Sequence, residues 1–373
     1  MYKTDKKVLF ITSSMTLGGI ERVLCTITDN LVDDYNITIL CLEKAKPFYK
    51  VNNKISILYV SKYFDVFYKA YRYIHNGFKK YFGIKLKPNL FIKSLCANFH
   101  FSTYDIIIFL PYSFFMFPKL IEECTSSKNI MWMHNNYKVY FEDYYKYMPR
   151  ELKEAIGHCD CIVSLTNEDK QGFGAYSDKV ITINNPVTID NKGFISNLQS
   201  KIISITCRFS IMHKGLDYLV QISKKIPANW KIAVAGTGSR DEIRDFKKLI
   251  KEANVESKFI LRGALEGKEL IDHYMNSSIY VMTSRWEGFG LVLTEAMSFG
   301  LPVISFENSG SKEILQDGKV GILIEQGDIV EFSNKLNLLI DNFCLREELS
   351  KKSLTRVKSF KREVIIGQWR GIL

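Results

Sequence analysis

Short apolar runs rich in β-branched residues alternate with helix-compatible stretches along the whole chain of 373 residues. Uninterrupted runs such as Ile106–Leu110 are typical of strands that are covered on both faces. Strands separated by helices predict right-handed βαβ units and parallel sheets. The expected strands are Val8–Ser14, Ile37–Leu42, Ile55–Val60, Asp105–Leu110, Asn129–His134, Cys161–Thr166 and Val180–Asn184 in the first half, and Ile202–Thr206, Lys231–Ala235, Phe259–Arg262, Ile279–Thr283, Pro302–Ser305 and Gly321–Ile324 in the second.

One interruption divides this pattern into two halves. Residues 187–200 lose the periodicity and are rich in Asn, Asp, Gly and Ser, which is typical of a linker. We therefore expect an α/β protein with two Rossmann-like, doubly wound parallel-sheet domains, residues 1–186 and residues 201–350. Ligands of such sheets bind beyond the carboxyl ends of the strands, so a cleft between two facing domains is the expected site.

The composition excludes several classes of protein. No run of about 20 apolar residues exists, and the apolar part of the N-terminus, Val8–Ile11, is too short for a signal peptide. The eight cysteines lack zinc or redox spacing and are expected to be reduced, mostly buried thiols. The histidines show no metal-site spacing and no Asp-x-Asp motif is present, so we expect neither a metal nor a cofactor. These features predict a cytoplasmic protein.

The segment Ser284–Ser305 is the strongest functional motif. An expected strand ends near Ser284, and a helix is expected from about Leu291 to Phe299. Between them lies a tight turn that consists of Glu287, Gly288, Phe289 and Gly290. Glycines let the backbone approach a ligand closely, and a helix start offers unpaired N–H groups and a positive dipole end to a diphosphate.

Two carboxylates accompany this turn. Glu287 lies in the turn, free to accept hydrogen bonds from sugar hydroxyls, and Glu295 lies about one turn inside the helix. A single carboxylate such as Glu295 can accept both hydroxyls of a ribose diol. Either glutamate alone would more often be a solvated surface charge, but the pair with this turn favours ligand binding.

Two cations follow the first expected strand of the second half. Arg208 follows Ile202–Thr206, and Lys214 with Gly215 begins the next expected helix. Cations in these positions can hold a pyrophosphate and stabilise its charge as it leaves. Ordinary surface basicity would explain an isolated Arg and Lys, whereas their position after this strand favours a clamp.

The spacing Glu-x7-Glu after a strand, followed by Ala296-Met297 and the run Gly300–Ile304, resembles the retaining glycosyltransferases of family GT4. The resemblance covers the whole C-terminal half and, more weakly, the N-terminal half. It implies the GT-B fold, with the nucleotide-sugar bound mainly by the C-terminal domain, Glu287 on the donor sugar and Glu295 on the ribose. It also implies that residues 351–373 form a helix that crosses back to the N-terminal domain.

The resemblance extends to weaker motifs of the second half. Gly236, in the turn Ala235–Gly238, resembles the family's Gly-x-Gly turn near the donor, although a tight turn before a helix explains it equally well. Arg262 resembles the segment in which family members pair backbone groups with the base. The expected donor-binding residues are thus Gly18, Gly19, Arg208, Lys214, Gly236, Arg262, Glu287, Gly288, Phe289, Gly290, Leu291 and Glu295, and the expected catalytic residues are Glu287, His134, Arg208 and Lys214.

In the first half, Gly18 and Gly19 follow the first expected strand and open a helix. They do not complete a G-x-G-x-x-G fingerprint, so NAD binding is not indicated. They resemble the glycine-rich loop that GT4 enzymes bring against the donor phosphates, and a simple βα turn explains them nearly as well. His134 stands at the end of another strand, where the family often has a His close to the transferred sugar. The alternative is a loop histidine bonded to the backbone.

The net charge of +11 is uneven. Residues 61–100 hold eight Lys or Arg and one acid, which gives +7, and aromatic and basic residues interleave between Tyr63 and Phe82. A basic helix with aromatic side chains suits an anionic bilayer, and a core-facing helix with a solvated basic side explains the pattern as well. No nucleic-acid motif accompanies the charge, so nucleic acid is not expected as a partner.

The motifs therefore predict a glycosyltransferase, and the GT4 resemblance implies a retaining hexosyl- or N-acetylhexosaminyltransferase. It would move a sugar from a nucleotide-sugar, a UDP-sugar by resemblance, to a glycan acceptor in cell-surface polysaccharide synthesis. A polyprenyl-diphosphate-linked acceptor is expected, presented where residues 61–100 attach the protein peripherally to the inner face of the cell membrane. Two other functions fit the same fold: a sugar-nucleotide epimerase, which needs no acceptor, and a non-catalytic glycan-binding scaffold.

Overall fold

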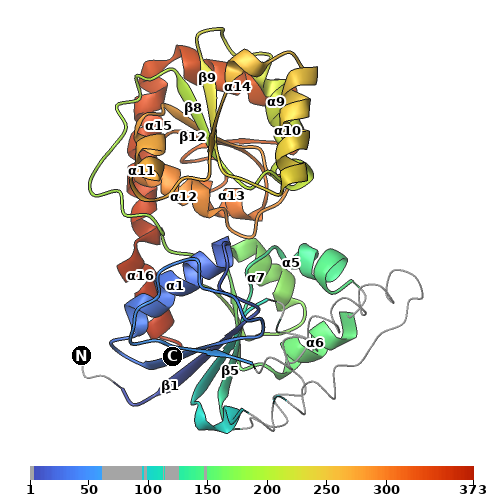
Figure 1. The fold of residues 1–373 in the computed structure, drawn as a ribbon, viewed down its shortest axis with the longest axis vertical. Helices are drawn as coiled ribbons and strands as arrows, with labels where there is room; N and C mark the ends of the chain where they lie inside the picture. The colour runs from blue at the N-terminus through green and yellow to red at the C-terminus, as the bar shows by residue number, and fades with distance from the viewer. Residues whose placement is uncertain (1–3, 61–94, 96–98, 112, 114–125, 147–148) are drawn as a thin grey trace. The chain divides into compact units, whose positions relative to one another are not determined.

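The computed structural model describes residues 4–60, 95, 99–111, 113, 126–146 and 149–373 (Figure 1). The chain divides into two compact units. Unit 1 comprises Met1–Asn184 and Arg362–Leu373, and unit 2 comprises Asn185–Lys361. The predicted membrane-binding stretch between Tyr63 and Phe82 lies outside the described residues.

Unit 1 is built on a seven-stranded parallel sheet in the order β3-β2-β1-β4-β5-β6-β7. All four residues of β4 are buried, as expected for a central strand that helices cover on both faces. The strands are β1 (Lys7–Thr12), β2 (Asn36–Cys41), β3 (Ser56–Tyr59), β4 (Ile106–Phe109), β5 (Lys128–Trp132), β6 (Cys161–Ser164) and β7 (Val180–Thr182). Its described α-helices include α1 (Gly19–Leu31), α5 (Tyr137–Val139), α6 (Pro149–His158) and α7 (Asn167–Gly174).

Unit 2 repeats this plan with a six-stranded parallel sheet in the order β10-β9-β8-β11-β12-β13. The strands are β8 (Ile202–Thr206), β9 (Lys231–Ala235), β10 (Phe259–Gly263), β11 (Ile279–Met282), β12 (Val303–Phe306) and β13 (Ile322–Ile324). The α-helices are α8 (Ile211–Lys214), α9 (Leu216–Ser223), α10 (Arg240–Glu252), α11 (Gly267–Met275), α12 (Leu291–Ser298), α13 (Ser309–Leu315), α14 (Ile329–Asp341) and α15 (Phe343–Arg356).

The predicted fold class is confirmed. Each of the thirteen expected strands is present, with ends that agree to within two residues, and both sheets are wound in two directions from a central first strand. Residues 187–200 do not form the separate linker that the sequence indicated, because they belong to unit 2 and pack on it. For example, the Ser196 amide donates to the Phe299 carbonyl at 2.9 Å.

The end of the chain returns to unit 1 as α16 (Arg362–Arg370) (Figure 1). Trp369 is almost fully buried there, with its ring 4.7 Å from that of Trp132. Arg370 forms an ion pair with Asp34 at 2.7 Å, and the Lys128 ammonium donates to the Ile372 carbonyl at 2.7 Å. Unit 1 therefore closes its core with residues that lie far away in the sequence.

Among the described residues, none of the helices has both the length and the apolar character needed to cross a membrane. The described cysteines are unpaired thiols, and Cys25, Cys41, Cys159 and Cys161 are buried. Burial, the main cause, raises the pKa of Cys25, Cys41, Cys159 and Cys207 to about 12. Since the thiolate is the reactive form, these four side chains are poor nucleophiles and serve as small apolar groups.

Candidate active site

Two loops of unit 2 meet beyond the carboxyl ends of the central strands β8 and β11. These strands are neighbours, and the next strands along the chain lie on opposite sides of them, which makes this the topological switch point of the sheet. Lys214 comes from the loop after β8 and Glu287 from the turn after β11. The Lys214 ammonium lies 2.7 Å from a Glu287 carboxylate oxygen. Fold topology thus brings together two predicted site residues from separate motifs.

The local backbone holds Lys214 in place. Lys214 ends the short helix α8 rather than beginning a helix, because Gly215 adopts a left-handed conformation (φ 60°) and α9 starts after it. A Cβ at Gly215 would lie 2.0 Å from the Thr283 carbonyl oxygen, so the close approach of the two loops requires glycine. The Thr283 hydroxyl donates to the Lys214 carbonyl at 2.8 Å and joins the loops a second time.

The Lys214–Glu287 pair is largely shielded from solvent, with 17% and 13% of the side chains exposed. Burial alone would raise the pKa of Glu287, but the charge and the hydrogen bond of nearby Lys214 outweigh it and lower the pKa below its usual value. Glu287 is therefore ionised at neutral pH. It is also not the free acceptor that the sequence predicted, because Lys214 already binds one of its oxygens.

Side chains from other loops fix the carbonyl groups of the turn that carries Glu287. The Gln326 amide donates to the carbonyls of Ser284 and Arg285, at 3.2 and 2.6 Å. The His213 ring donates to the Trp286 carbonyl at 3.0 Å, and the Ser309 hydroxyl donates to the Glu287 carbonyl at 3.2 Å. Four successive carbonyls are thus held from outside the turn, which preorganises the position of Glu287.

Arg285 and Trp286 brace the same turn. The Arg285 guanidinium forms two hydrogen bonds with the Asp217 carboxylate, at 2.9 and 2.6 Å, and lies over the Tyr218 ring at 3.9 Å. The Trp286 ring stacks on His213 with centroids 4.7 Å apart. Burial, followed by the charge of Lys214, lowers the pKa of His213, so this imidazole is neutral and acts as a hydrogen-bond donor.

The helix start expected after the turn is present. Gly290 has φ 92° and α12 begins at Leu291, as predicted. Phe289 is buried and packs against Phe360, so its side chain belongs to the core and only its backbone can serve a ligand. A Cβ at Gly310 would lie 2.2 Å from the Phe289 carbonyl oxygen, so α13 approaches the turn closely.

Glu295 lies in a different environment from the one the sequence predicted. Its side chain is fully buried. One carboxylate oxygen accepts a hydrogen bond from the Thr188 hydroxyl at 2.6 Å, and the other accepts one from the Tyr274 hydroxyl at 3.0 Å. A ribose diol can therefore reach this carboxylate only if Thr188, which lies in the segment expected as a linker, moves away.

Arg208 remains open to solvent. Its side chain is 68% exposed, and its guanidinium lies 3.6 Å from the Glu242 carboxylate in α10. At this exposure and distance the pair contributes little stability. Arg208 also helps to lower the pKa of His213, which places its charge near the Lys214–Glu287 pair. It is thus free to turn toward an anion bound there.

Gly236 follows β9, and Arg262 lies near the end of the neighbouring strand β10. Gly236 has φ 141°, and a Cβ there would lie 1.8 Å from the Cys207 carbonyl oxygen, so this close approach requires glycine. The Arg262 guanidinium lies 3.1 Å from a ring nitrogen of buried His273. Burial, followed by the charge of Arg262, lowers the pKa of His273 to about 3 and keeps it neutral.

The remaining predicted residues lie on unit 1. Gly18 caps α1 with an extended backbone, and Gly19 is the first residue of that helix, as predicted. The backbone N–H of His134 donates to the Tyr140 hydroxyl at 2.9 Å, and its ring lies 4.2 Å from that of Trp132. Burial lowers the pKa of His134 to about 3, so it offers a neutral imidazole rather than a cation.

Sequence reasoning missed the residues that position the site. Asp217, Ser309 and Gln326 are ordinary polar residues in the sequence, and they contact the turn across 22 to 68 positions. Only the folded loops bring them together. The recognisable motif, in contrast, consists of the residues that these side chains hold.

Three comparisons identify relatives. Residues 189–356 match the family model for glycosyl transferases group 1. The chain is 31% identical over 380 residues to an uncharacterized glycosyltransferase of Haemophilus influenzae, covering 99% of this chain and 100% of that relative. It is 23% identical to the GalNAc-alpha-(1->4)-GalNAc-alpha-(1->3)-diNAcBac-PP-undecaprenol alpha-1,4-N-acetyl-D-galactosaminyltransferase of Campylobacter jejuni, covering 98% of each. The crystal structure of HepE from Anabaena in complex with UDP and glucose matches with a TM-score of 0.77 at 14% identity, covering 99% of both chains.

The two doubly wound units and this structural likeness define the fold as GT-B, and the protein is a glycosyltransferase. Identity above 30% over nearly the full length of a relative, together with the matching model, settles the family. The chain belongs to the glycosyl transferases of group 1.

Proposed function

We propose that this protein is a retaining transferase of the GT4 type that takes a hexosyl or N-acetylhexosaminyl group from a UDP-sugar. The observation that carries the proposal is the Lys214–Glu287 pair, 2.7 Å apart at the switch point of unit 2 and next to the start of α12. A buried cation beside a helix start suits the diphosphate, and the ionised Glu287 suits the sugar hydroxyls. The likeness to HepE, whose crystals hold UDP and glucose, supports this choice of donor.

In the proposed donor complex, the diphosphate takes over the Lys214 ammonium and attracts the exposed Arg208. Glu287, released from Lys214 in part, accepts hydrogen bonds from the sugar. The α12 start adds backbone N–H groups around Leu291. These cationic and dipolar groups neutralise the charge of the leaving diphosphate, and we propose that no metal is needed.

The proposed reaction replaces one bond at the anomeric carbon. The bond from this carbon to the diphosphate oxygen breaks, and the acceptor oxygen bonds to the same face. The acceptor proton passes to the departing diphosphate. Retention rests on the GT4 resemblance, and the described thiols of Cys25, Cys41, Cys159 and Cys207 are too weakly acidic to act as nucleophiles instead.

Glu295 is proposed to bind the ribose after exchanging the Thr188 hydroxyl for a ribose hydroxyl. The two bonds that it accepts from Thr188 and Tyr274 show that its carboxylate has room for two hydroxyl donors. The free protein then keeps this buried charge satisfied from its own chain. Donor binding must break the 2.6 Å bond from Thr188 before the ribose can form its own.

The acceptor is proposed to be a glycan, carried on a polyprenyl diphosphate, in cell-surface polysaccharide synthesis. The name of the Campylobacter jejuni relative gives a PP-undecaprenol-linked glycan, and that relative aligns with nearly the whole chain. We propose peripheral attachment to the inner face of the membrane through residues 61–100. Liposome co-sedimentation tests this attachment, and unchanged binding and activity after charge reversal at Lys79 and Lys80 would contradict it.

A screen of UDP- and GDP-sugars tests the proposed donor. Thermal stabilisation and release of the nucleoside diphosphate should select a UDP-sugar, and NMR of the product should show a retained anomeric configuration. Lys214→Met should abolish donor binding, whereas Lys224→Met, an exposed lysine of unit 2, should leave it intact. Conversion of the nucleotide-sugar into an epimer without acceptor would indicate an epimerase instead. Donor binding without turnover would indicate a scaffold.

A further inference from the structure

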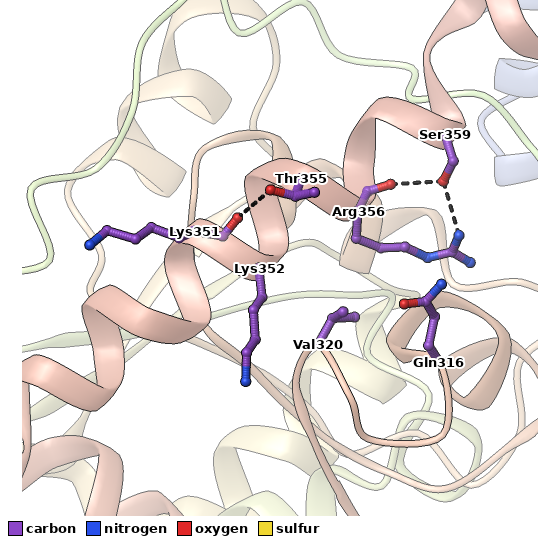
Figure 2. A pocket seen from close by; sticks show the side chains of 7 residues that line it. All are labelled: Gln316, Val320, Lys351, Lys352, Thr355, Arg356 and Ser359. Atoms are coloured by element: carbon purple, nitrogen blue, oxygen red, sulfur yellow. Dashed lines mark hydrogen bonds between the residues drawn. The ribbon is translucent and has the colours of Figure 1, made fainter.

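Unit 2 has a basic cavity outside the donor site. It has a volume of about 470 Å³ and lies between the loop after α13 and the last turns of α15 (Figure 2). Gln316 and Val320 line it from the loop, and Lys351, Lys352, Arg356 and Ser359 line it from α15 and the turn that follows. None of these residues belongs to the Lys214–Glu287 site.

The charge of this cavity is not balanced by its own lining. Lys351, Lys352 and Arg356 contribute three cations, and none of the described residues that line the cavity is acidic. Lys352 does form an ion pair, at 2.7 Å, with Glu348, one helical turn earlier on α15. Residues 351–361, the last segment of unit 2, carry five Lys or Arg and no acid. Such a concentration of one charge around a hollow attracts anions.

Arg356 has a structural role that also fixes its direction. Its Nε and one Nη donate to the Ile314 and Glu313 carbonyls at the end of α13, at 3.0 and 2.8 Å. Its other Nη donates to the Ser359 hydroxyl at 3.0 Å. A guanidinium has five N–H groups, so two remain on an otherwise immobile side chain. Capping of α13 explains Arg356, and the ion pair with Glu348 accounts for Lys352, but neither contact involves the Lys351 ammonium.

The lining also indicates the kind of anion. It has no aromatic side chain on which a base could stack, so a nucleotide is not favoured. In Figure 2 the Arg356 guanidinium and the Gln316 amide lie together, and their N–H groups suit the oxygens of one phosphate. The Lys351 ammonium points away from them and the Lys352 ammonium is paired with Glu348, so the two lysines add positive charge rather than direct hydrogen bonds. The cavity is larger than a bare phosphate, and Val320 gives it one apolar wall.

We propose that this cavity is a second anion site that binds the phosphate group of a small phosphoester. Such a phosphate is present both in free polyol or sugar phosphates and in phospholipid headgroups. Calorimetry of the full-length protein with glycerol 3-phosphate tests the free form, and co-sedimentation with vesicles of phosphatidylglycerol and phosphatidylcholine in equal parts tests the headgroup. Each measurement is made with saturating UDP, so that the donor site is occupied, and at low and high salt.

Lys351→Gln/Lys352→Gln should weaken the binding of at least one of these probes about tenfold, and salt should weaken the binding to wild-type protein. Arg356 is left unchanged because its loss would uncap α13. The matched control is Lys247→Gln/Lys248→Gln, which removes the same charge from the exposed face of α10 and should bind as wild-type. Loss with glycerol 3-phosphate indicates a free phosphoester, and loss with vesicles alone indicates a lipid headgroup.

Three results would overturn the proposal. Wild-type protein that binds neither probe has no such site. Equal binding by the Lys351/Lys352 variant and the wild type would show that these lysines are only solvated charges. Binding that is present without UDP and disappears when UDP saturates the donor site would assign the anion to the donor site.

Discussion

Thr188→Val should tighten the binding of UDP. In the free protein the partly buried Thr188 hydroxyl donates to the fully buried Glu295 at 2.6 Å. A hydrogen bond from a hydroxyl to a buried carboxylate stabilises the free protein by about 1.5 kcal/mol, which corresponds to about tenfold in affinity. Valine has nearly the same shape and cannot donate, so the ribose no longer has to displace this bond.

Calorimetric titration of UDP into wild type, Thr188→Val and Thr188→Ser measures the effect. The valine variant should bind about tenfold more tightly and should unfold in less urea, because Glu295 has lost a partner in the free protein. The serine variant keeps a hydroxyl and should resemble wild type in both measurements. If Thr188→Val loses stability while its UDP affinity is unchanged or weaker, Glu295 only anchors residues 185–200 to unit 2 and does not bind the ribose.

Three further predictions concern stability. Lys214→Met should lower the free energy of unfolding by about 3 kcal/mol, because it leaves the buried Glu287 carboxylate unpaired. In urea denaturation, Lys214→Met/Glu287→Gln should recover most of this loss. If the single and the double variant lose the same free energy of unfolding, the explanation is contradicted. The lowered pKa of Glu287 means that the stability it contributes is complete above about pH 4.5, its unfolded value, and is lost as the pH falls through the folded pKa. The difference in unfolding free energy between wild type and Glu287→Gln should therefore be constant near neutral pH and shrink only in acid, and a change between pH 6 and 8 would refute the assignment. Trp369→Ala should lower the free energy of unfolding by about 3 kcal/mol, because it leaves a cavity beside Trp132. A melting temperature close to that of wild type would contradict the packing described for α16.

Much of the fold could be predicted from the sequence because it depends on local patterns. Apolar runs such as Ile106–Phe109 are strands in any protein whose helices cover both faces of a sheet, and the start of α12 follows from the glycines before it. The strand ends were less predictable. His134 and Thr283, expected inside strands, lie in the loops beyond β5 and β11, where the His134 N–H bonds to the Tyr140 hydroxyl and the Thr283 hydroxyl bonds to the Lys214 carbonyl.

The candidate site was predictable in its members and not in their contacts. Sequence motifs single out Lys214, Glu287 and Glu295, but no local pattern shows that Lys214 would pair with Glu287 or that Thr188 would cover Glu295. These contacts join positions 73 and 107 residues apart. They depend on which loops the sheet topology brings together, and the charges of these residues do not predict which of them will pair.

The return of α16 to unit 1 has a consequence for protein engineering. In terms of chain connectivity, unit 2 is an insertion into unit 1, since the chain passes between the units after Asn184 and again after Lys361. A chimera that exchanges donor preference between two relatives should therefore transplant residues 185–361 as a block. The recipient keeps its own final helix, because that helix supplies Trp369 to the core of unit 1. A single crossover near residue 186 would instead build unit 1 from the first part of one protein and the final helix of another.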